Sequence, residues 1–440
     1  MFDHRPTLSY AGWREQVSGS GRRWRSAVRR GTKIIGVDYS SAVGIVIRIA
    51  VGLAGISLAL ATFLSAIKLV VVPKGTSQRI TRFVFTIVRG FLRVYARPRL
   101  PWVKRDHRLA FYAPVSLVLL PIAWVSMIIV GFAGIHWALD PRSLGDAFYV
   151  SGSSMLTLGV MFRRNGPAAF LSFTQAAIGL IVVALLISYL PAIYAAFSKR
   201  EVLVGLLESR AGTPPSPVTM LVRFHFVGGL DRLPSFFERW EDWFVEVEES
   251  HTNFAALNFF RSPSADRSWI TAAGCVLDTA ALSLSVLDRP TSPEAALCLR
   301  AGFLSLRKIS DYFMIPHNDD PQPTDPISIS RREFDLMYTE LHAAGVELKD
   351  DHDKAWADYC GWRVNYDTTL VRLATVIQAP PAHWSSDRVA EPFRPALVRT
   401  RRRVRVHTER QLALRTGALP TVAVGSPPAD RLATNLTTVR

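Results

Sequence analysis

Cysteine is scarce in this chain of 440 residues, which contains only Cys275, Cys298 and Cys360. Their spacing matches neither a paired metal-ligand motif nor a disulfide framework, so we expect ordinary reduced thiols. The sequence also lacks a nucleotide-binding glycine loop, a zinc signature and a nucleophile elbow. These absences argue against an enzyme and predict a protein without a cofactor or a bound metal.

Acidic residues are scarce in the first part of the chain. Residues 1–198 contain 23 Lys and Arg against 6 Asp and Glu, whereas residues 199–440 contain 29 against 30. A basic excess can indicate nucleic-acid binding, but these basic residues flank apolar runs, where anionic lipid headgroups account for them. We therefore expect a lipid bilayer as the partner and no nucleic acid.

Three long runs contain no charged residue: Ile49–Ile67, Leu109–Leu139 and Asn165–Ser198, of 19, 31 and 34 residues. Each can cross a hydrocarbon core, which takes about 20 residues of helix. The first run follows a long basic arm and lacks a small-residue cleavage pattern, so we interpret it as a retained anchor and not as a signal peptide. The chain is predicted to be a multi-pass protein of the plasma membrane.

The pattern predicts a mainly α fold, with three transmembrane helices, a re-entrant segment and a helical cytoplasmic domain. The expected parts are a basic arm at 1–40, a first transmembrane helix at 41–69, a basic cytoplasmic amphipathic loop at 70–108, a two-span module at 109–200, a helical cytoplasmic domain at 201–378 and a basic, disordered tail at 379–440. Within the module we expect an outer helix at 109–139, a loop at 143–164 and an inner helix at 167–198.

The loop between the first two spans determines the predicted topology. From Lys74 to Arg108 it has ten Lys and Arg and a single acid, Asp106. Basic loops stay in the cytoplasm, so the second span is expected to run outward and the third to return, which leaves the basic amino-terminal arm outside. Apolar residues recur in this loop at helical spacing between arginines, which indicates an interfacial amphipathic helix; they are Ile80, Phe83, Val84, Ile87, Phe91 and Val94.

The segment between the second and third spans is semi-apolar and too short to cross the membrane. Its residues 144–156, LGDAFYVSGSSML, have helical character and lead into Thr157, Leu158 and Gly159. A short helix that dips into the bilayer and returns as extended backbone fits this pattern. Such backbone is tolerated only where it is buried in protein or lines a water-filled path, which favours a pore over an ordinary extracellular loop.

The order of span, re-entrant helix, Thr-x-Gly and span resembles the pore domain of potassium channels over roughly residues 109–200. In that family backbone carbonyls and a Thr hydroxyl replace the hydration shell of the ion. The resemblance implies a selectivity filter at Thr157, Leu158, Gly159 and Val160, an inner-helix hinge at Gly179 and a homotetramer around one central path. With a leading span and the downstream stretches WEDWFVEVEESHTNFAALNFFRS and SWITAAGCVLDTAALSL, the chain is similar to a bacterial group of ion-channel-like proteins over most of residues 41–290.

The residues after Val160 differ from the family pattern, in which an aromatic residue, Gly and Asp follow. Here the chain continues with Met161, Phe162, Arg163 and Arg164, which would form the pore mouth. A filter glycine permits positive φ, which costs a residue with a side chain about 1 kcal/mol or more. We therefore expect Met161 not to reproduce the outer ion site, and rings of Arg are associated with anion selection.

The remaining motifs lie in the predicted cytoplasmic domain. Its aromatic residues Phe236, Phe237, Trp240, Trp243 and Phe244 recur at helical spacing and are expected to form a core. Asp278 lies among apolar residues, as a buried, paired carboxylate or on an exposed stripe. The cluster Asp350, Asp351, His352 and Asp353 fits a charged helix start better than a metal site, because the glycine and terminal glutamate of a calcium loop are absent.

These features predict a potassium-channel-like membrane protein that passes cations through a tetrameric pore, with potassium as the permeant ion. The alternative is a non-conducting membrane scaffold or sensor that retains the pore fold.

Overall fold

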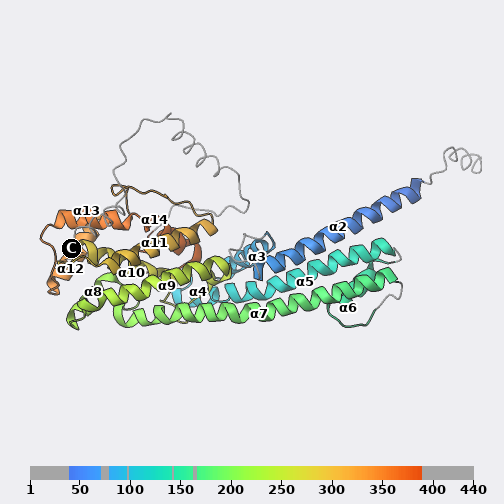
Figure 1. Ribbon diagram of the computed structural model, residues 1–440, viewed down its shortest axis with the longest axis horizontal. Helices are drawn as coiled ribbons and strands as arrows, with labels where there is room; N and C mark the ends of the chain where they lie inside the picture. Colours follow the sequence, from blue (N-terminus) through green and yellow to red (C-terminus); the bar gives the residue numbers. More distant parts are fainter. Residues whose placement is uncertain (1–38, 71–78, 97–98, 141–142, 162–165, 389–440) are drawn as a thin grey trace, which may run out of the picture. The chain divides into compact units, whose positions relative to one another are not determined.

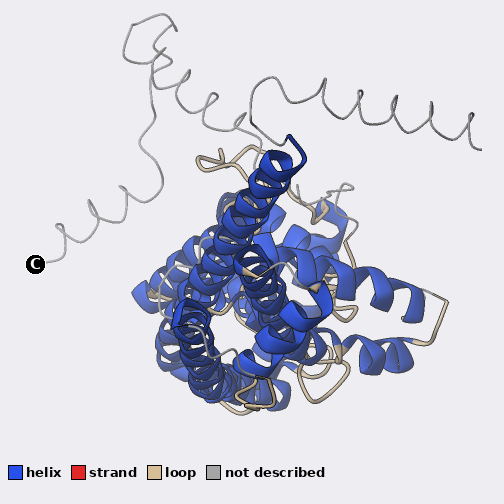
Figure 2. Ribbon diagram, turned by 90° about the vertical axis from the view of Figure 1, so that its right-hand side faces the viewer, coloured by secondary structure: helices blue, strands red, loops and turns tan. Residues whose placement is uncertain are grey.

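The computed structural model describes residues 39–70, 79–96, 99–140, 143–161 and 166–388, and these residues are mainly helical (Figures 1 and 2). The described part contains no β-strand and only an isolated bridge between Leu287 and Leu348. The predicted mainly α fold is confirmed. The α-helices are α2 (Tyr39–Val70), α3 (Arg79–Tyr95), α4 (Trp102–Leu109), α5 (Tyr112–Leu139), α6 (Leu144–Met155), α7 (Gly166–Ala211), α8 (Pro217–Phe226), α9 (Leu233–Asn253), α10 (Trp269–Ser285), α11 (Pro293–Tyr312), α12 (Arg331–Ala343), α13 (His352–Arg363) and α14 (Asp367–Ile377).

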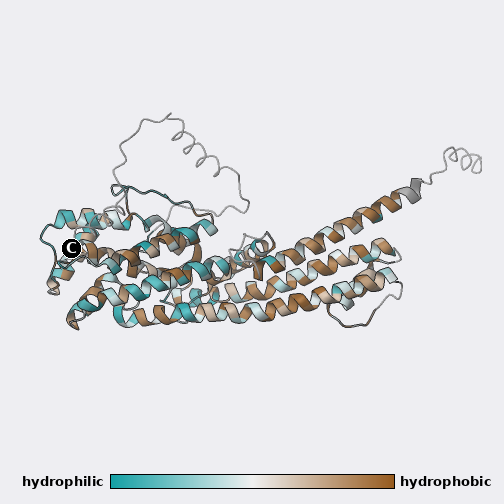
Figure 3. Ribbon diagram, in the orientation of Figure 1, coloured by the Kyte–Doolittle hydropathy of each residue, from teal (hydrophilic) through white to brown (hydrophobic). Residues whose placement is uncertain are grey.

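Three helical stretches are long and apolar enough to cross a bilayer. They are Val43–Val70, Trp102–Leu139 and Gly166–Ala211. Figure 3 shows nearly continuous hydrophobic colour along α2 and along the parts of α5 and α7 that correspond to the uncharged runs. The three predicted spans are therefore present as helices, as expected of a membrane protein.

The chain divides into two compact units. Unit 1 comprises Met1–Pro73 and Val118–Pro191, and unit 2 comprises Lys74–Leu117 and Ala192–Arg440. The division falls inside α5 and α7, so each of these helices contributes to both units. In α7 it coincides with Pro191, whose ring removes one backbone donor from the helix interior.

Small residues let α2 and α5 approach closely in unit 1. A Cβ atom added to Gly131 would lie 2.8 Å from the carbonyl oxygen of Gly55 and 3.1 Å from the Cβ of Ala59. Gly52 faces Ala138 in the same way, at 3.1 Å. Membrane helices lack a hydrophobic driving force between them, so close packing of such residues stabilises the pair.

The core of unit 2 is built around α10. This helix is apolar on all sides, and 15 of its 17 residues are buried by its neighbours. Its composition resembles a short membrane segment, but a helix that is hydrophobic all round is equally typical of a domain centre. The predicted aromatic core is confirmed, because Phe237, Trp240, Trp243 and Phe244 are each no more than 2% exposed and Phe236 packs against them.

The basic helices α3 and α4 belong to unit 2 and bind its carboxyl-terminal part. Arg89 of α3 donates to the carbonyl of Val376 (3.2 Å), and Arg105 of α4 donates to Oε1 of Gln378 (2.8 Å). Asp106 forms an ion pair with Arg261. The predicted amphipathic helix is therefore present, but one of its faces packs on protein.

The exposed face of α3 remains apolar. Phe83, Ile87, Phe91 and Val94 are between 54% and 72% exposed, whereas Val84, Val88 and Leu92 are buried. The sequence pattern does not distinguish these two apolar faces, because residues on both repeat with the helical period.

Three predicted boundaries differ from the structure. The inner helix continues 13 residues beyond Ser198 to Ala211, since the uncharged run marks the apolar span and not the helix end. The outer helix begins at Tyr112, after the separate α4. The tail was predicted to begin at Ala379, but residues 379–388 pack on unit 2, where Trp384 is 1% exposed. The arm at 1–38 and the tail from 389 lie outside the described residues.

Candidate functional site

The loop between α5 and α7 begins with the short helix α6. Ser143 caps its first turn by accepting a hydrogen bond from the backbone N–H of Asp146 (3.4 Å), and the carboxylate of Asp146 lies in that turn, where the helix dipole favours it. The helix ends at Met155, and Leu156 follows as its carboxyl-terminal cap. The predicted short helix before Thr157 is therefore present.

A chain of polar contacts fixes α6 between its neighbours. The hydroxyl of Ser151 donates to the carbonyl oxygen of Ile129 in α5 (2.8 Å) and accepts from Nε2 of Gln175 in α7 (2.7 Å). Ser151 and Gln175 are both fully buried. Gln175 lies within the uncharged run of α7. Polar residues within such apolar spans usually serve a specific contact.

Gly179 allows the end of α6 to approach α7. A Cβ atom at this position would collide with the carbonyl oxygen of Met155, so only glycine fits without a shift. Met155 is itself buried and packs in a small core with Phe132 and Val182. The structure thus gives Gly179 a packing role where the sequence predicted a hinge.

The backbone after α6 turns away from helical geometry at two alternate residues. Thr157 has φ of 56° and Gly159 has φ of 67°. Glycine adopts such values readily, but a β-branched threonine does so at a cost of order 1–3 kcal/mol, and backbone strain of this kind is concentrated at functional sites. Two backbone hydrogen bonds hold the turn. The N–H of Thr157 donates to the carbonyl oxygen of Ser154 (3.1 Å), and the N–H of Leu158 donates to the carbonyl oxygen of Ser153 (2.8 Å).

Five of the eight predicted site residues lie on this one segment. Thr157, Leu158, Gly159 and Val160 follow each other directly after α6 and are exposed in the single chain, Leu158 at 62% and Val160 at 80%. Met161 is 38% exposed, and its backbone does not adopt positive φ. Phe162, Arg163 and Arg164 lie outside the described residues.

Ser153 connects α6 to the end of the candidate filter segment at Met161. Its hydroxyl oxygen accepts a hydrogen bond from the backbone N–H of Met161 at 3.1 Å, across eight residues. Ser153, Ser151 and Gln175 were not among the predicted site residues. Their polarity within an otherwise apolar module is the feature that could have identified them.

The remaining titratable clusters in the described residues form structural contacts. No group of three His, Cys, Asp or Glu residues in the described part of the chain could hold a metal. Asp351 caps α13 by accepting from the N–H of Lys354 (2.9 Å), so the predicted charged helix start at 350–353 is confirmed. Burial raises the pKa of the Cys360 thiol to about 11 and raises those of Cys275 and Cys298 above their usual range, which disfavours reactive thiolates.

Asp278 is a buried, paired carboxylate. It is 1% exposed and accepts hydrogen bonds from Arg363 (2.6 Å) and from the hydroxyl of Tyr366 (2.7 Å). Arg363 also pairs with Asp367 at 2.7 Å. Burial alone would lower the pKa of Arg363, but these two carboxylates raise it well above its usual value. The network therefore connects α10, α13 and α14 as an ion triad.

A second buried network joins α7 to α9. Nη1 of Arg200 donates to Nε2 of His251 (3.2 Å) and to the carbonyl oxygen of Leu257 (3.0 Å). A guanidinium only donates, so Nε2 accepts, and Nδ1 carries the ring hydrogen that is donated to the carbonyl of Val247 (2.9 Å). Burial and the charge of Arg200 lower the pKa of His251 well below 6.5.

Comparisons of the chain with protein-family models, with curated proteins and with solved structures found no match.

Proposed function

We propose that this protein is a potassium-channel-like membrane protein in which α5, α6 and α7 form the pore module of one subunit. The observation that carries the proposal is the strained, exposed backbone at Thr157–Val160, which follows a short helix held between two membrane-length helices. Irregular backbone inside a membrane needs protein or water around it, and a shared central path supplies both.

A homotetramer accounts for the exposure of this segment. Each chain supplies one Thr157–Val160 segment, and a ring of carbonyl oxygens around an ion requires several copies. Leu158 and Val160 expose apolar side chains in the single chain, and neighbouring subunits would cover them. Potassium is the proposed permeant ion, with the Thr157 hydroxyl and the backbone carbonyls as its ligands.

The basic loop and the helical domain are proposed to lie in the cytoplasm. Helices α3 and α4 bond to residues 261 and 376–378 within unit 2, so both belong on one side of any membrane. The basic excess of the loop favours the cytoplasmic side of a plasma membrane. With three spans, the amino-terminal arm is then outside.

Met161 favours a second candidate function, a non-conducting scaffold or sensor. Its backbone lacks positive φ, and its N–H is bound to Ser153. An outer ion site that depends on a glycine conformation is then missing, and the pore fold could serve only to assemble the subunits.

Flux measurements on purified protein in liposomes distinguish the two functions. We expect potassium flux down a gradient, and its loss in Thr157→Ala, which removes the filter hydroxyl. Thr174→Ala is the matched control, because this exposed hydroxyl on α7 bonds only within its own helix, to Phe170 (2.9 Å). Absence of flux at every gradient and voltage would support the scaffold, and a strictly monomeric crosslinking pattern in membranes would contradict both the shared pore and the tetramer.

A further inference from the structure

Unit 2 contains a cavity of about 530 Å³ at the carboxyl-terminal end of α7. Its walls come from α7, from the end of α8 and from the start of α9, all within residues 203–240. Ligand pockets for small molecules typically have about 300–1,000 Å³, so the cavity is large enough for one.

The lining of this cavity is strongly basic. Four of its 15 lining residues are arginines and none is acidic; the arginines are Arg210, Arg223, Arg232 and Arg239. Of the acids next to these arginines in sequence, Glu208 pairs with Arg267 and Asp231 pairs with Arg289. Glu238, beside Arg239, is exposed and does not line the cavity. The positive charge of the cavity is therefore not neutralised from within its own lining.

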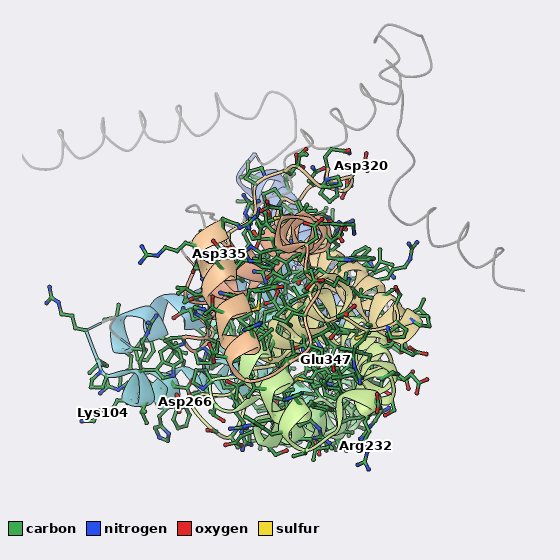
Figure 4. The ribbon with its side chains drawn as sticks, turned by 90° about the vertical axis from the view of Figure 1, so that its left-hand side faces the viewer. Lys104, Arg232, Asp266, Asp320, Asp335 and Glu347 are labelled. Atoms are coloured by element: carbon green, nitrogen blue, oxygen red, sulfur yellow. The ribbon has the colours of Figure 1, made fainter. Side chains whose placement is uncertain are left out.

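Two of the arginines are fixed, and two have free donors. Arg210 donates to the carbonyl of Leu206 (3.0 Å), and Arg223 donates to that of Ser209 (3.1 Å), so both are held at the last turns of α7. The side chains of Arg232 and Arg239 are exposed and form no hydrogen bond or ion pair with the described part of the chain. Figure 4 shows Arg232 at the edge of the domain, extending away from the packed helices.

The apolar part of the lining is aromatic. The rings of Phe224 and Phe236 lie 5.9 Å apart between centroids, and Phe236 lies 5.9 Å from Trp240. Guanidinium groups bind phosphate oxygens through paired N–H donors, and aromatic rings provide stacking surfaces for planar groups. The cavity can thus accommodate a ligand that carries anionic groups next to a planar or apolar body.

We propose that this cavity binds a phosphorylated small molecule with a planar body, of the nucleotide class. Arg232 and Arg239 hold its phosphate groups, and the partly exposed rings of Phe224 and Phe236 provide the surface for the planar part. Lipid headgroups share the phosphate chemistry, but the lining residues of α7 lie 5–12 residues beyond the uncharged run, or roughly 8–18 Å along the helix. This distance favours a soluble ligand.

Isothermal titration of the full-length protein in phosphatidylcholine nanodiscs tests the proposal, with ATP, AMP, adenosine and inorganic phosphate as probes. We expect saturable binding of ATP or AMP that is tighter than the binding of adenosine or phosphate alone. The double variant Arg232→Gln/Arg239→Gln should weaken it by about tenfold or more, because each charge-assisted hydrogen bond contributes substantially. Neither side chain has a partner among the described residues, so the variant should unfold at the wild-type temperature.

Arg300→Gln/Arg332→Gln is the matched control, because both arginines are exposed in unit 2 and neither lines the cavity. Equal binding by the Arg232/Arg239 variant and by wild type, or no binding of any nucleotide, would overturn the proposal. Binding that occurs only with phosphatidylglycerol vesicles and is lost in the same variant would overturn the nucleotide assignment in favour of a headgroup site. These readouts need no ion flux, so this proposal and the pore proposal can fail separately.

Discussion

At the scale of single residues, His251 makes the stability of unit 2 dependent on pH. Its pKa is lowered in the folded state, so below about pH 6.5 the unfolded state binds more protons than the folded state. The free energy of unfolding therefore decreases as the pH is lowered. We expect thermal unfolding at pH 5 to occur well below the temperature at pH 7.5.

His251→Gln tests the origin of this effect, because an amide can reproduce both hydrogen bonds without titrating. The variant should lose most of the pH dependence between 7.5 and 5. An unchanged slope would assign the acid sensitivity to other groups.

The buried ion triad of Asp278, Arg363 and Asp367 also contributes to the stability of unit 2. Arg363→Met should lower the free energy of unfolding by about 3–5 kcal/mol, since it leaves two buried carboxylates without their cation. Arg331→Met is the control, because its pairs with Asp335 and Asp353 are partly exposed and should contribute about 1 kcal/mol or less. Chemical denaturation measures both, and equal losses would contradict the dominant role of burial.

Met161→Gly tests the interpretation of the filter. The substitution permits positive φ at the position where potassium channels have glycine. We therefore expect any potassium flux across liposome membranes to increase. A reduced flux would contradict this interpretation of the filter.

At the scale of elements, the close approach of α6 and α7 determines the position of the candidate filter. Gly179→Ala places a methyl group against the carbonyl of Met155 and should displace α6, lowering both thermal stability and potassium flux. Gly152→Ala on α6 is the control, because nothing lies within 4 Å of its added Cβ. Size-exclusion profiles after heating report the stability, and identical profiles for the two variants would argue against the packing role.

At the scale of the whole molecule, the topology can be tested with introduced cysteines. Asp320 lies in an exposed loop of unit 2, and Asp140 lies between α5 and α6. In a Cys360→Ser background, a membrane-impermeant maleimide should label Asp140→Cys in intact cells and Asp320→Cys only after permeabilisation. Labelling of position 320 in intact cells would invert the proposed orientation.

Much of the fold follows from the sequence, because uncharged runs and helical periodicity depend on local composition. The apolar spans, the short helix before Thr157 and the aromatic core around Trp240 and Trp243 were all predictable in this way. The candidate site was predictable only in outline, because the Thr-Leu-Gly pattern identifies the segment but not the contacts that hold it.

The tertiary structure alone decided which residues meet. It placed Ser151 against Gln175, Gly179 against Met155 and Arg363 between two aspartates, and it showed that α3 presents one apolar face to protein and leaves the other exposed. Arg363 and Asp367 are four residues apart, but the other pairs are separated by 24 residues or more along the chain. Sequence periodicity carries no information on contacts at such distances. The sequence by itself determined the helices and their apolar spans through local patterns, whereas the strained backbone at Thr157 and the arginine-lined cavity arise from how those helices pack.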